Sequence, residues 1–289
     1  MKPSVSSKPI IKVSVAGTQE VNDMLAAEEP LEIRIGYAAF SQRVQKSISV
    51  TMRTPGNDFE LATGFLFTEG IIKNGEDIIS IKHCNGLHEN VVRVELKDDV
   101  KLDLTRLERN FYTTSSCGVC GKSSIEAVKT VCRLPAAEND NVLFSPEIIY
   151  SLPGILRSRQ AIFENTGGLH ACALFDTSGD LLLTREDVGR HNALDKLIGA
   201  AIGQFSFPLD KFILLLSGRA SFELIQKAWM AGIKIVAAVG APSSLAVQMS
   251  AECGMTLIGF LRGKGFNIYS GSQRVNISAW EEKDSALKG

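Results

Sequence analysis

Two cysteines, Cys117 and Cys120, stand two residues apart in a polar stretch between residues 114 and 122. A glycine follows each of them, so the backbone can turn tightly and expose both sulfur atoms. Lys122 and a predicted helix from residue 123 place positive charge beside the pair, which favours the thiolate, the nucleophilic form of cysteine. The spacing therefore indicates thiol chemistry.

Spacing alone leaves four interpretations of this pair open. A closed zinc site needs four ligands, and no second pair with metal spacing follows along the chain. A thioredoxin-like redox pair normally follows the first strand of a small fold, near the N-terminus. The other two interpretations are a sulfur carrier, whose cysteine holds an activated sulfur as a persulfide, and a pair of structural cysteines.

The composition describes an ordinary globular protein, with 45% apolar and 22% charged residues among 289. A net charge of −1 gives no overall attraction to nucleic acid or to an anionic membrane. The longest apolar run, residues 212–216, is far shorter than the ~20 residues that cross a bilayer. We therefore expect a cytoplasmic protein that binds neither nucleic acid nor membrane. In the cytoplasm its thiols stay reduced, and four isolated cysteines are expected to be small core residues: Cys84, Cys132, Cys172 and Cys253.

The pattern of apolar residues predicts two unequal halves after a polar start. Residues 1–25 are weakly patterned and are expected to form a loose arm. Residues 26–138 predict a β-rich α+β module that ends in the cysteine loop. Residues 139–289 alternate strand-like and helix-like segments, which predicts an α/β domain with a sheet between layers of helices.

Individual elements follow from the same periodicities. The expected strands are 31–35, 44–52, 78–83, 90–97, 169–176, 180–185, 212–217, 233–239 and 255–260. The expected helices are 59–67, one starting at Pro146 after a Ser145 cap, 188–203, 220–231 and 243–252. In helix 188–203 the apolar positions predict that Leu194, Leu197, Ile198 and Ala201 face inward. Asp195 and Lys196 are expected to face solvent.

Several polar stretches in the second half are typical of ligand sites. Residues 185–192 include two arginines, two acids, a histidine and an amide at a predicted helix start. This composition indicates either a site that binds phosphate or the edge of a heterocycle, or a solvated corner of ion pairs. The turn 166–170 ends on His170, either a proton donor and acceptor or part of a plain tight turn. Loops 217–221 and 240–244 follow predicted strands, where anionic ligands bind in open α/β sheets. Neither has P-loop spacing, which argues against nucleotide hydrolysis.

Residues 259–267 mix aromatic rings, glycines and two cations. Such a loop can stack a flat ring and hold a phosphate, or it can be a plain hairpin turn.

Taken together, these stretches resemble one family, the formate dehydrogenase accessory sulfurtransferases of the FdhD type. The matching segments occur in the family's order over roughly residues 28 to 270: 54–58, 117–121, 166–170, 185–193, 217–221 and 240–244. The run Arg-Glu-Asp-Val-Gly-Arg-His-Asn at 185–192 makes a chance match improbable.

The resemblance implies a sulfur relay. Cys117 would accept sulfur from a cysteine desulfurase as a persulfide, assisted by Cys120, and pass it to the bis(molybdopterin guanine dinucleotide) cofactor that formate dehydrogenase needs. That cofactor is cargo, and no resident metal is expected. The resemblance places cargo binding on Phe260, Leu261, Arg262, Gly263, Lys264 and Gly265. It also implies a cytidine deaminase-like second domain and a homodimer.

Two other classes of protein compete with this interpretation. A zinc nucleoside deaminase is suggested by His170 and Cys172 together with the cysteine pair, but the required glutamate is missing and the order of motifs is reversed. A non-catalytic chaperone of formate dehydrogenase, binding cofactor without moving sulfur, would use the same loops.

Overall fold

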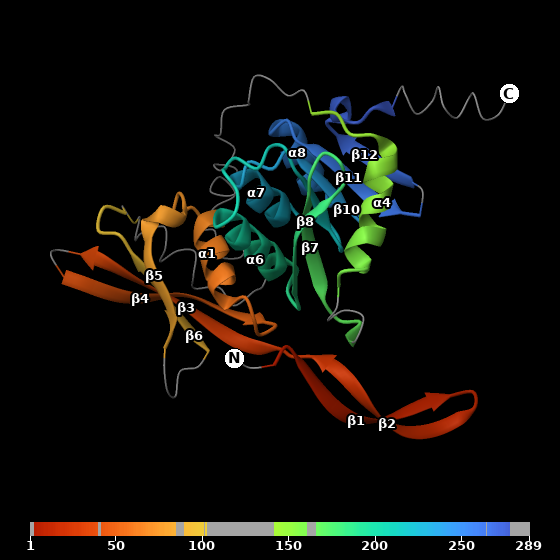
Figure 1. Ribbon diagram of the computed structural model, residues 1–289, viewed down its shortest axis with the longest axis horizontal. Helices are drawn as coiled ribbons and strands as arrows, with labels where there is room; N and C mark the ends of the chain where they lie inside the picture. Colours follow the sequence, from red (N-terminus) through yellow and green to blue (C-terminus); the bar gives the residue numbers. More distant parts are fainter. Residues whose placement is uncertain are drawn as a thin grey trace.

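The structure is a computed structural model that describes residues 3–39, 42–84, 90–100, 102, 142–160, 166–263 and 265–277. Within these residues the chain forms three β-sheets, five α-helices and two short 3-10 helices, η1 (Gly75–Asp77) and η2 (Ser272–Arg274) (Figure 1). The predicted mixed α and β architecture is confirmed. None of the helices in these ranges is both long and apolar enough to span a membrane.

A four-stranded sheet in the order β4-β3-β6-β5 makes up the first half. Its strands are β3 (Glu29–Ala39), β4 (Gln42–Arg53), β5 (Ile78–His83) and β6 (Val91–Leu96), as predicted. Leu31, Ile33 and Ile35 alternate along β3 and are fully buried. They share one core with helix α1 (Asp58–Thr68), which was predicted at 59–67.

A six-stranded sheet in the order β12-β11-β10-β9-β7-β8 makes up the second half. Its strands are β7 (His170–Phe175), β8 (Leu181–Asp187), β9 (Ile213–Leu216), β10 (Ile235–Ala238), β11 (Thr256–Arg262) and β12 (Gly265–Ser270). The central strands β9, β10 and β11 are parallel, and β7, β8 and β12 run antiparallel to their neighbours. The helices are α4 (Pro146–Arg157), α6 (Arg190–Ile202), α7 (Phe222–Met230) and α8 (Ser244–Glu252).

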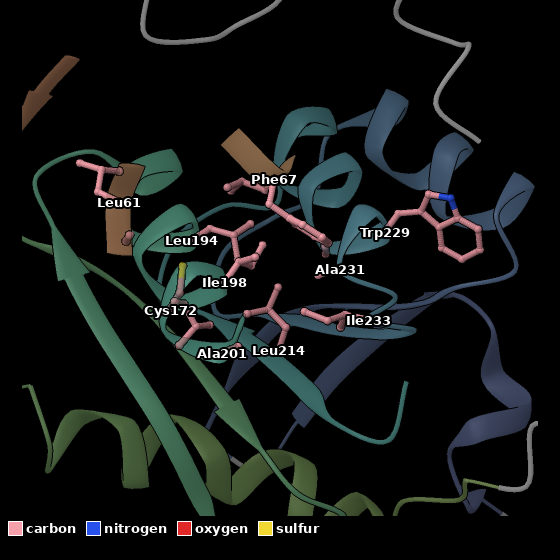
Figure 2. Close-up of a cluster of buried hydrophobic side chains, with 14 of the residues drawn as sticks. Leu61, Phe67, Cys172, Leu194, Ile198, Ala201, Leu214, Trp229, Ala231 and Ile233 are labelled. Atoms are coloured by element: carbon pink, nitrogen blue, oxygen red, sulfur yellow. The ribbon is translucent and has the colours of Figure 1, made fainter. Parts of the chain in front are cut away.

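Helices cover both faces of this sheet, as the alternating pattern predicted. In β9, Leu214 and Leu216 belong to the large core with α6 and α7, whereas Ile213 and Leu215 belong to a smaller core with α4. Figure 2 shows part of the large core, where side chains from α1, α6 and β9 meet. Ser145 caps α4 by accepting a hydrogen bond from the backbone of Ile148, as expected.

The two halves share this large core, because α1 crosses α6 at very close range. Gly64 of α1 and Gly199 of α6 lie at the crossing. A Cβ on Gly64 would fall far inside van der Waals contact of the Asp195 backbone oxygen, and one on Gly199 would do the same to Glu60. The predicted boundary between residues 138 and 139 lies outside the described residues and stays a prediction.

The expectation of a loose arm over residues 1–25 is wrong for most of that segment. Strands β1 (Val5–Ser14) and β2 (Gly17–Ala26) pair antiparallel over ten residues each. The ribbon escaped prediction because nearly all of its residues are exposed. Neither face therefore carries the apolar alternation that marks a half-buried strand.

The expectation that Asp195 and Lys196 face solvent is also wrong, since both are at most 2% exposed. Leu194, Leu197 and Ile198 are buried as predicted. The polar side of α6 is buried as well because α1 and α7 lie against it. Each charge has a partner: Lys196 Nζ lies 2.7 Å from an Asp187 oxygen.

We expect Gly64→Ala and Gly199→Ala each to lower the free energy of unfolding by about 3 kcal/mol or more, because the new methyl group meets backbone that cannot yield without separating the helices. Denaturant unfolding would measure this. Gly154→Ala in α4 is the matched control, since a Cβ there meets open space. It should raise stability by about 0.5–1 kcal/mol. Near-wild-type stability of both core variants would contradict the close crossing.

Candidate functional site

The polar loops of the second half meet at one edge of the six-stranded sheet. Because β9, β10 and β11 are parallel, the loops 217–221 and 240–243 that follow two of them lie at the same edge. β7 runs antiparallel to β9, so its first residue, His170, lies there too. Helices α6, α7 and α8 begin at this edge. We call it the carboxyl edge, and edges of this kind bind anionic ligands.

The two loops hold each other in place. The backbone N–H of Gly240 donates to the Gly218 oxygen at 3.0 Å, and that of Ser243 donates to the Ala220 oxygen at 3.0 Å. A Cβ on Gly240 would approach the Gly218 oxygen to 3.0 Å, so glycine allows the close approach. Ser217 Oγ accepts a hydrogen bond from Ala171 N at 2.8 Å. The loops therefore form a fixed platform.

His170 lies over this platform. A Cβ on Gly218 would stand 3.2 Å from its Nδ1, so the ring lies almost against the backbone. Burial lowers the pKa of His170, and Arg190 and His191 lower it further, while Asp187 opposes them. The imidazole is therefore neutral at neutral pH and is able to accept a proton.

The starts of α6 and α7 differ in charge. Glu223 lies in the first turn of α7, and its Oε2 is 3.9 Å from His191 Nε2. Burial raises the pKa of Glu223, but hydrogen bonds from His191, its own backbone and Ser221 outweigh this, so the pKa is lowered. The α7 start thus has its own anion. At α6 the N-cap is Gly189, with no side-chain cap and no acid in the first turn.

The residues of the run 185–192 have two different roles. Arg185 pairs with Glu60 of α1 through two bonds of 2.5 and 2.7 Å. Asn192 Nδ2 donates to the Met52 oxygen at 2.7 Å. These residues hold the two halves of the chain together, which neither of the two interpretations of the run foresaw.

Asp187 belongs to the same group of holding residues. Besides Lys196, it accepts hydrogen bonds from the backbone N–H groups of Thr54 and Gly189. The carboxylate is fully buried. Arg190 and His191, the first two residues of α6, lie at the carboxyl edge outside this group of holding residues.

The predicted cargo segment begins at this edge, since Phe260 N donates to the Gly240 oxygen at 3.1 Å. Phe260 is 37% exposed and has a φ of 53°, an unusual conformation for a bulky residue. The Arg262 guanidinium lies 5.7 Å from the Phe260 ring centroid. These two residues present a flat ring and a cation together.

The other members of the segment differ in what they can offer a ligand. Leu261 is fully buried in the smaller core, so its side chain cannot contact a ligand, contrary to expectation. Gly263 has a φ of 61° and turns the chain from β11 into β12, whose first residue is Gly265. The alternative interpretation as a hairpin is therefore correct for the backbone. Lys264 lies outside the described residues.

Cys117 and Cys120 also lie outside the described residues, as does Cys132. Cys172 and Cys253 are buried as expected, and burial raises the pKa of the Cys172 thiol. Cys84 is partly exposed. Within the described ranges no group of three or more His, Cys, Asp or Glu side chains is placed to hold a metal ion.

Sequence analysis missed Glu223 as a member of the edge. The available signal was an acid two residues after Ser221 at a predicted helix start, a position typical of an acid that stabilises the helix. Its pairing with His191, which lies on another helix, required the fold.

The fold and this edge define an α/β protein with a polar site at the carboxyl ends of parallel strands. The sequence pattern of the FdhD/NarQ family matches residues 26–276, and the chain belongs to that family. The predicted resemblance is thereby confirmed.

Relatives and a solved structure agree with this membership. The chain is 49% identical over 278 residues to the sulfur carrier protein FdhD of Streptomyces coelicolor, covering 94% of this chain and 96% of the relative. It is 53% identical over 263 residues to the sulfur carrier protein FdhD of Mycolicibacterium paratuberculosis, covering 88% and 92%. A crystal structure described as a formate dehydrogenase accessory protein from Desulfotalea psychrophila has the same fold, with a TM-score of 0.72 at 24% identity, over 94% of this chain and all of that one.

The lowered pKa of His170 makes stability depend on pH. Below the ordinary pKa of about 6.5, the unfolded state binds more protons at this position than the folded state, so stability falls as pH falls through that value. We expect the wild type to lose more stability than His170→Gln between about pH 7.5 and about pH 5.5. Denaturant unfolding of both proteins at each pH measures the difference. An opposite sign would mean that the folded protein favours the imidazolium.

Proposed function

We propose that this protein is a sulfur carrier that serves the maturation of formate dehydrogenase. It takes sulfur from a cysteine desulfurase as a persulfide on Cys117, assisted by Cys120, and delivers it to the bis(molybdopterin guanine dinucleotide) cofactor. The observation that carries the proposal is family membership over residues 26–276, a range that includes the cysteine pair. Relatives about half identical over most of the chain are named sulfur carriers.

The sulfur step follows thiol–disulfide chemistry. The Cys117 thiolate attacks the outer sulfur of the donor persulfide, an S–S bond forms on Cys117, and the donor cysteine leaves as a thiolate. This transfer consumes no external oxidant or reductant. On delivery the S–S bond would break with its electron pair left on Cys117, which becomes a thiolate again, and the two electrons that convert the transferred sulfur to sulfide would come from the metal of the cargo. Lys122 and the glycines around the pair favour an accessible, ionised Cys117.

The carboxyl edge suits the cargo. A cofactor with pyrophosphates needs cations and free backbone N–H groups, and its guanines need flat apolar surfaces with edge partners. Arg190 at the α6 start meets the first need, and the Phe260 ring with Arg262 meets the second. Leu261 contributes only packing. The residues present therefore fit a dinucleotide cargo.

Three further features complete the proposal. The second half has a cytidine deaminase-like arrangement, with one mixed sheet between helices. The protein acts as a homodimer, and it works in the cytoplasm, where its cysteine pair stays reduced.

Cys117→Ala should abolish activation of formate dehydrogenase, because the persulfide has no other carrier, while the thermal unfolding midpoint stays near that of the wild type. Mass spectrometry after incubation with a desulfurase and cysteine should find about +32 Da on the peptide that carries Cys117, the mass of one transferred sulfur. Cys84→Ala is the control and should keep both properties. A Cys117→Ala protein that still activates formate dehydrogenase fully would remove this cysteine from the relay. Cofactor binding without any persulfide would instead indicate a chaperone.

Guanosine diphosphate should bind the carboxyl edge as a fragment of the cargo. Arg262→Ala should weaken its binding by roughly 1–3 kcal/mol, the cost of losing a charge-assisted hydrogen bond, and Arg190→Ala by a similar amount. Isothermal titration calorimetry measures both, with Lys97→Ala, just after β6 of the four-stranded sheet, as the control. Equal affinity for adenosine diphosphate, or unchanged binding in both arginine variants, would place the cargo site elsewhere.

A further inference from the structure

The loop 54–57, which joins β4 to α1, touches the second half of the chain at its first residue, Thr54. The Thr54 hydroxyl accepts a hydrogen bond from Val188 N at 3.1 Å, and its backbone N–H donates to an Asp187 oxygen at the same distance. Both partners belong to the segment 187–189, which leads from β8 into α6. Since Thr54 is only 1% exposed, any effect it has on the carboxyl edge passes through this segment.

The Asp187 carboxylate is already filled with donors. One of its oxygens accepts hydrogen bonds from Gly189 N at 2.8 Å and from Asn192 Nδ2 at 3.2 Å. The other accepts the bond from Thr54 N and lies 2.7 Å from Lys196 Nζ. A carboxylate has about four acceptor positions, so this buried anion has none left for further N–H groups at the start of α6.

The first N–H groups of α6 therefore remain available. The first backbone hydrogen bond of the helix joins Ala193 N to the Gly189 oxygen, so the N–H groups of residues 190–192 precede it and have no acceptor inside the helix. In the part of the chain that the structure describes, no side chain caps this start. Arg190 Nε is buried and has no partner among the described residues. Backbone and side-chain donors thus stand ready for an anion.

We infer that Thr54 is a positioning residue for a phosphate of the cargo. By binding Val188 and Asp187, it holds the segment 187–189 in the conformation that sets the donors of the α6 start side by side. Several N–H groups bind one anion only while they converge on it, so a small rotation of this segment would weaken the site. The inference rests on the proposed function, since it assigns the loop 54–57 to the cargo site.

The two halves of the chain do not depend on the Thr54 hydroxyl to stay together. Arg185 pairs with Glu60, and the crossing of α1 and α6 gives the halves a shared apolar core. Without the hydroxyl, the partly buried Val188 N–H would lack its acceptor, and the segment would shift toward another one. We therefore expect loss of the hydroxyl to change the site and to leave the fold intact.

Thr54→Val tests the inference, because it keeps the shape of the side chain and removes the hydroxyl. Isothermal titration calorimetry with inorganic pyrophosphate should show binding about five- to tenfold weaker than in the wild type, the range expected from one lost hydrogen bond. Thr54→Ser keeps the hydroxyl and should bind within about twofold of the wild type. The matched control is Thr63→Val. Thr63 is also buried, but its hydroxyl donates to the Phe59 oxygen within α1, so its loss should leave binding unchanged.

Guanosine separates positioning from a general loosening of the site. Because guanosine lacks the phosphates, Thr54→Val should bind it as the wild type does, while binding of guanosine diphosphate weakens by about five- to tenfold. Thr54→Ala also lacks the hydroxyl and should repeat both results. Thermal unfolding should show that each variant remains folded.

Two failures are distinguishable. Unchanged pyrophosphate binding in Thr54→Val and Thr54→Ala, or an equal loss of guanosine binding, would overturn the inference and leave the cargo site standing. A wild type that binds neither pyrophosphate nor guanosine diphosphate would overturn the cargo site and this inference with it.

Discussion

The close crossing of α1 and α6 is the contact on which the rest of the structure depends. Glycines at 64 and 199 let the two backbones touch, so α1 packs the four-stranded sheet against the six-stranded one and both sheets contribute to the large core. α6 is then covered by the sheet, by α1 and by α7. Its first residues lie at the carboxyl edge, so the crossing also fixes where Arg190 and His191 stand. A packing constraint in the middle of the molecule thereby sets the geometry of its polar site.

Two buried ion pairs follow from that coverage. Asp195 accepts bonds of 2.9 Å from Lys227 of α7 and one of 2.8 Å from Thr68 of α1, so three helices meet at one carboxylate. Burial raises the pKa of Asp195, and Lys227 and Thr68 oppose that rise. Lys196 similarly joins Asp187 to the Thr54 oxygen. Buried ion pairs add little net stability, but removing one partner leaves the other charge buried and unpaired. The pairs therefore favour the one arrangement of the helices in which both partners meet.

The sequence predicted the strands and helices well because most of them have one apolar face, and that face sets a clear period of 2 or 3.6. The prediction failed where the burial of a residue does not follow from its polarity. Asp195 and Lys196 are charged but buried, which no periodicity distinguishes from a solvated face. The β1–β2 ribbon is the opposite case, with regular strands and no buried face.

At the site, the strand ends 217–221 and 240–243 were located correctly, since their position depends on local order along the chain. The contacts of His170 with Gly218 and of His191 with Glu223 depend on strand order, which one sequence does not encode locally.

The electrostatics of the carboxyl edge distinguish its three helix starts. Glu223 occupies the start of α7, and Ser243 caps α8 by accepting a hydrogen bond from Ala246 N at 3.2 Å. α6 has no acid in its first turn and no side-chain cap, and it begins with an arginine. The Asp187 carboxylate that accepts from the Gly189 N–H is already paired with Lys196, so in the proposed function Arg190 and the start of α6 together hold a phosphate of the cargo. The neutral imidazole of His170 adds no charge there. The imidazole can accept a proton, and in the proposed function it would lie near the phosphate. A second cation at this position could not accept a proton.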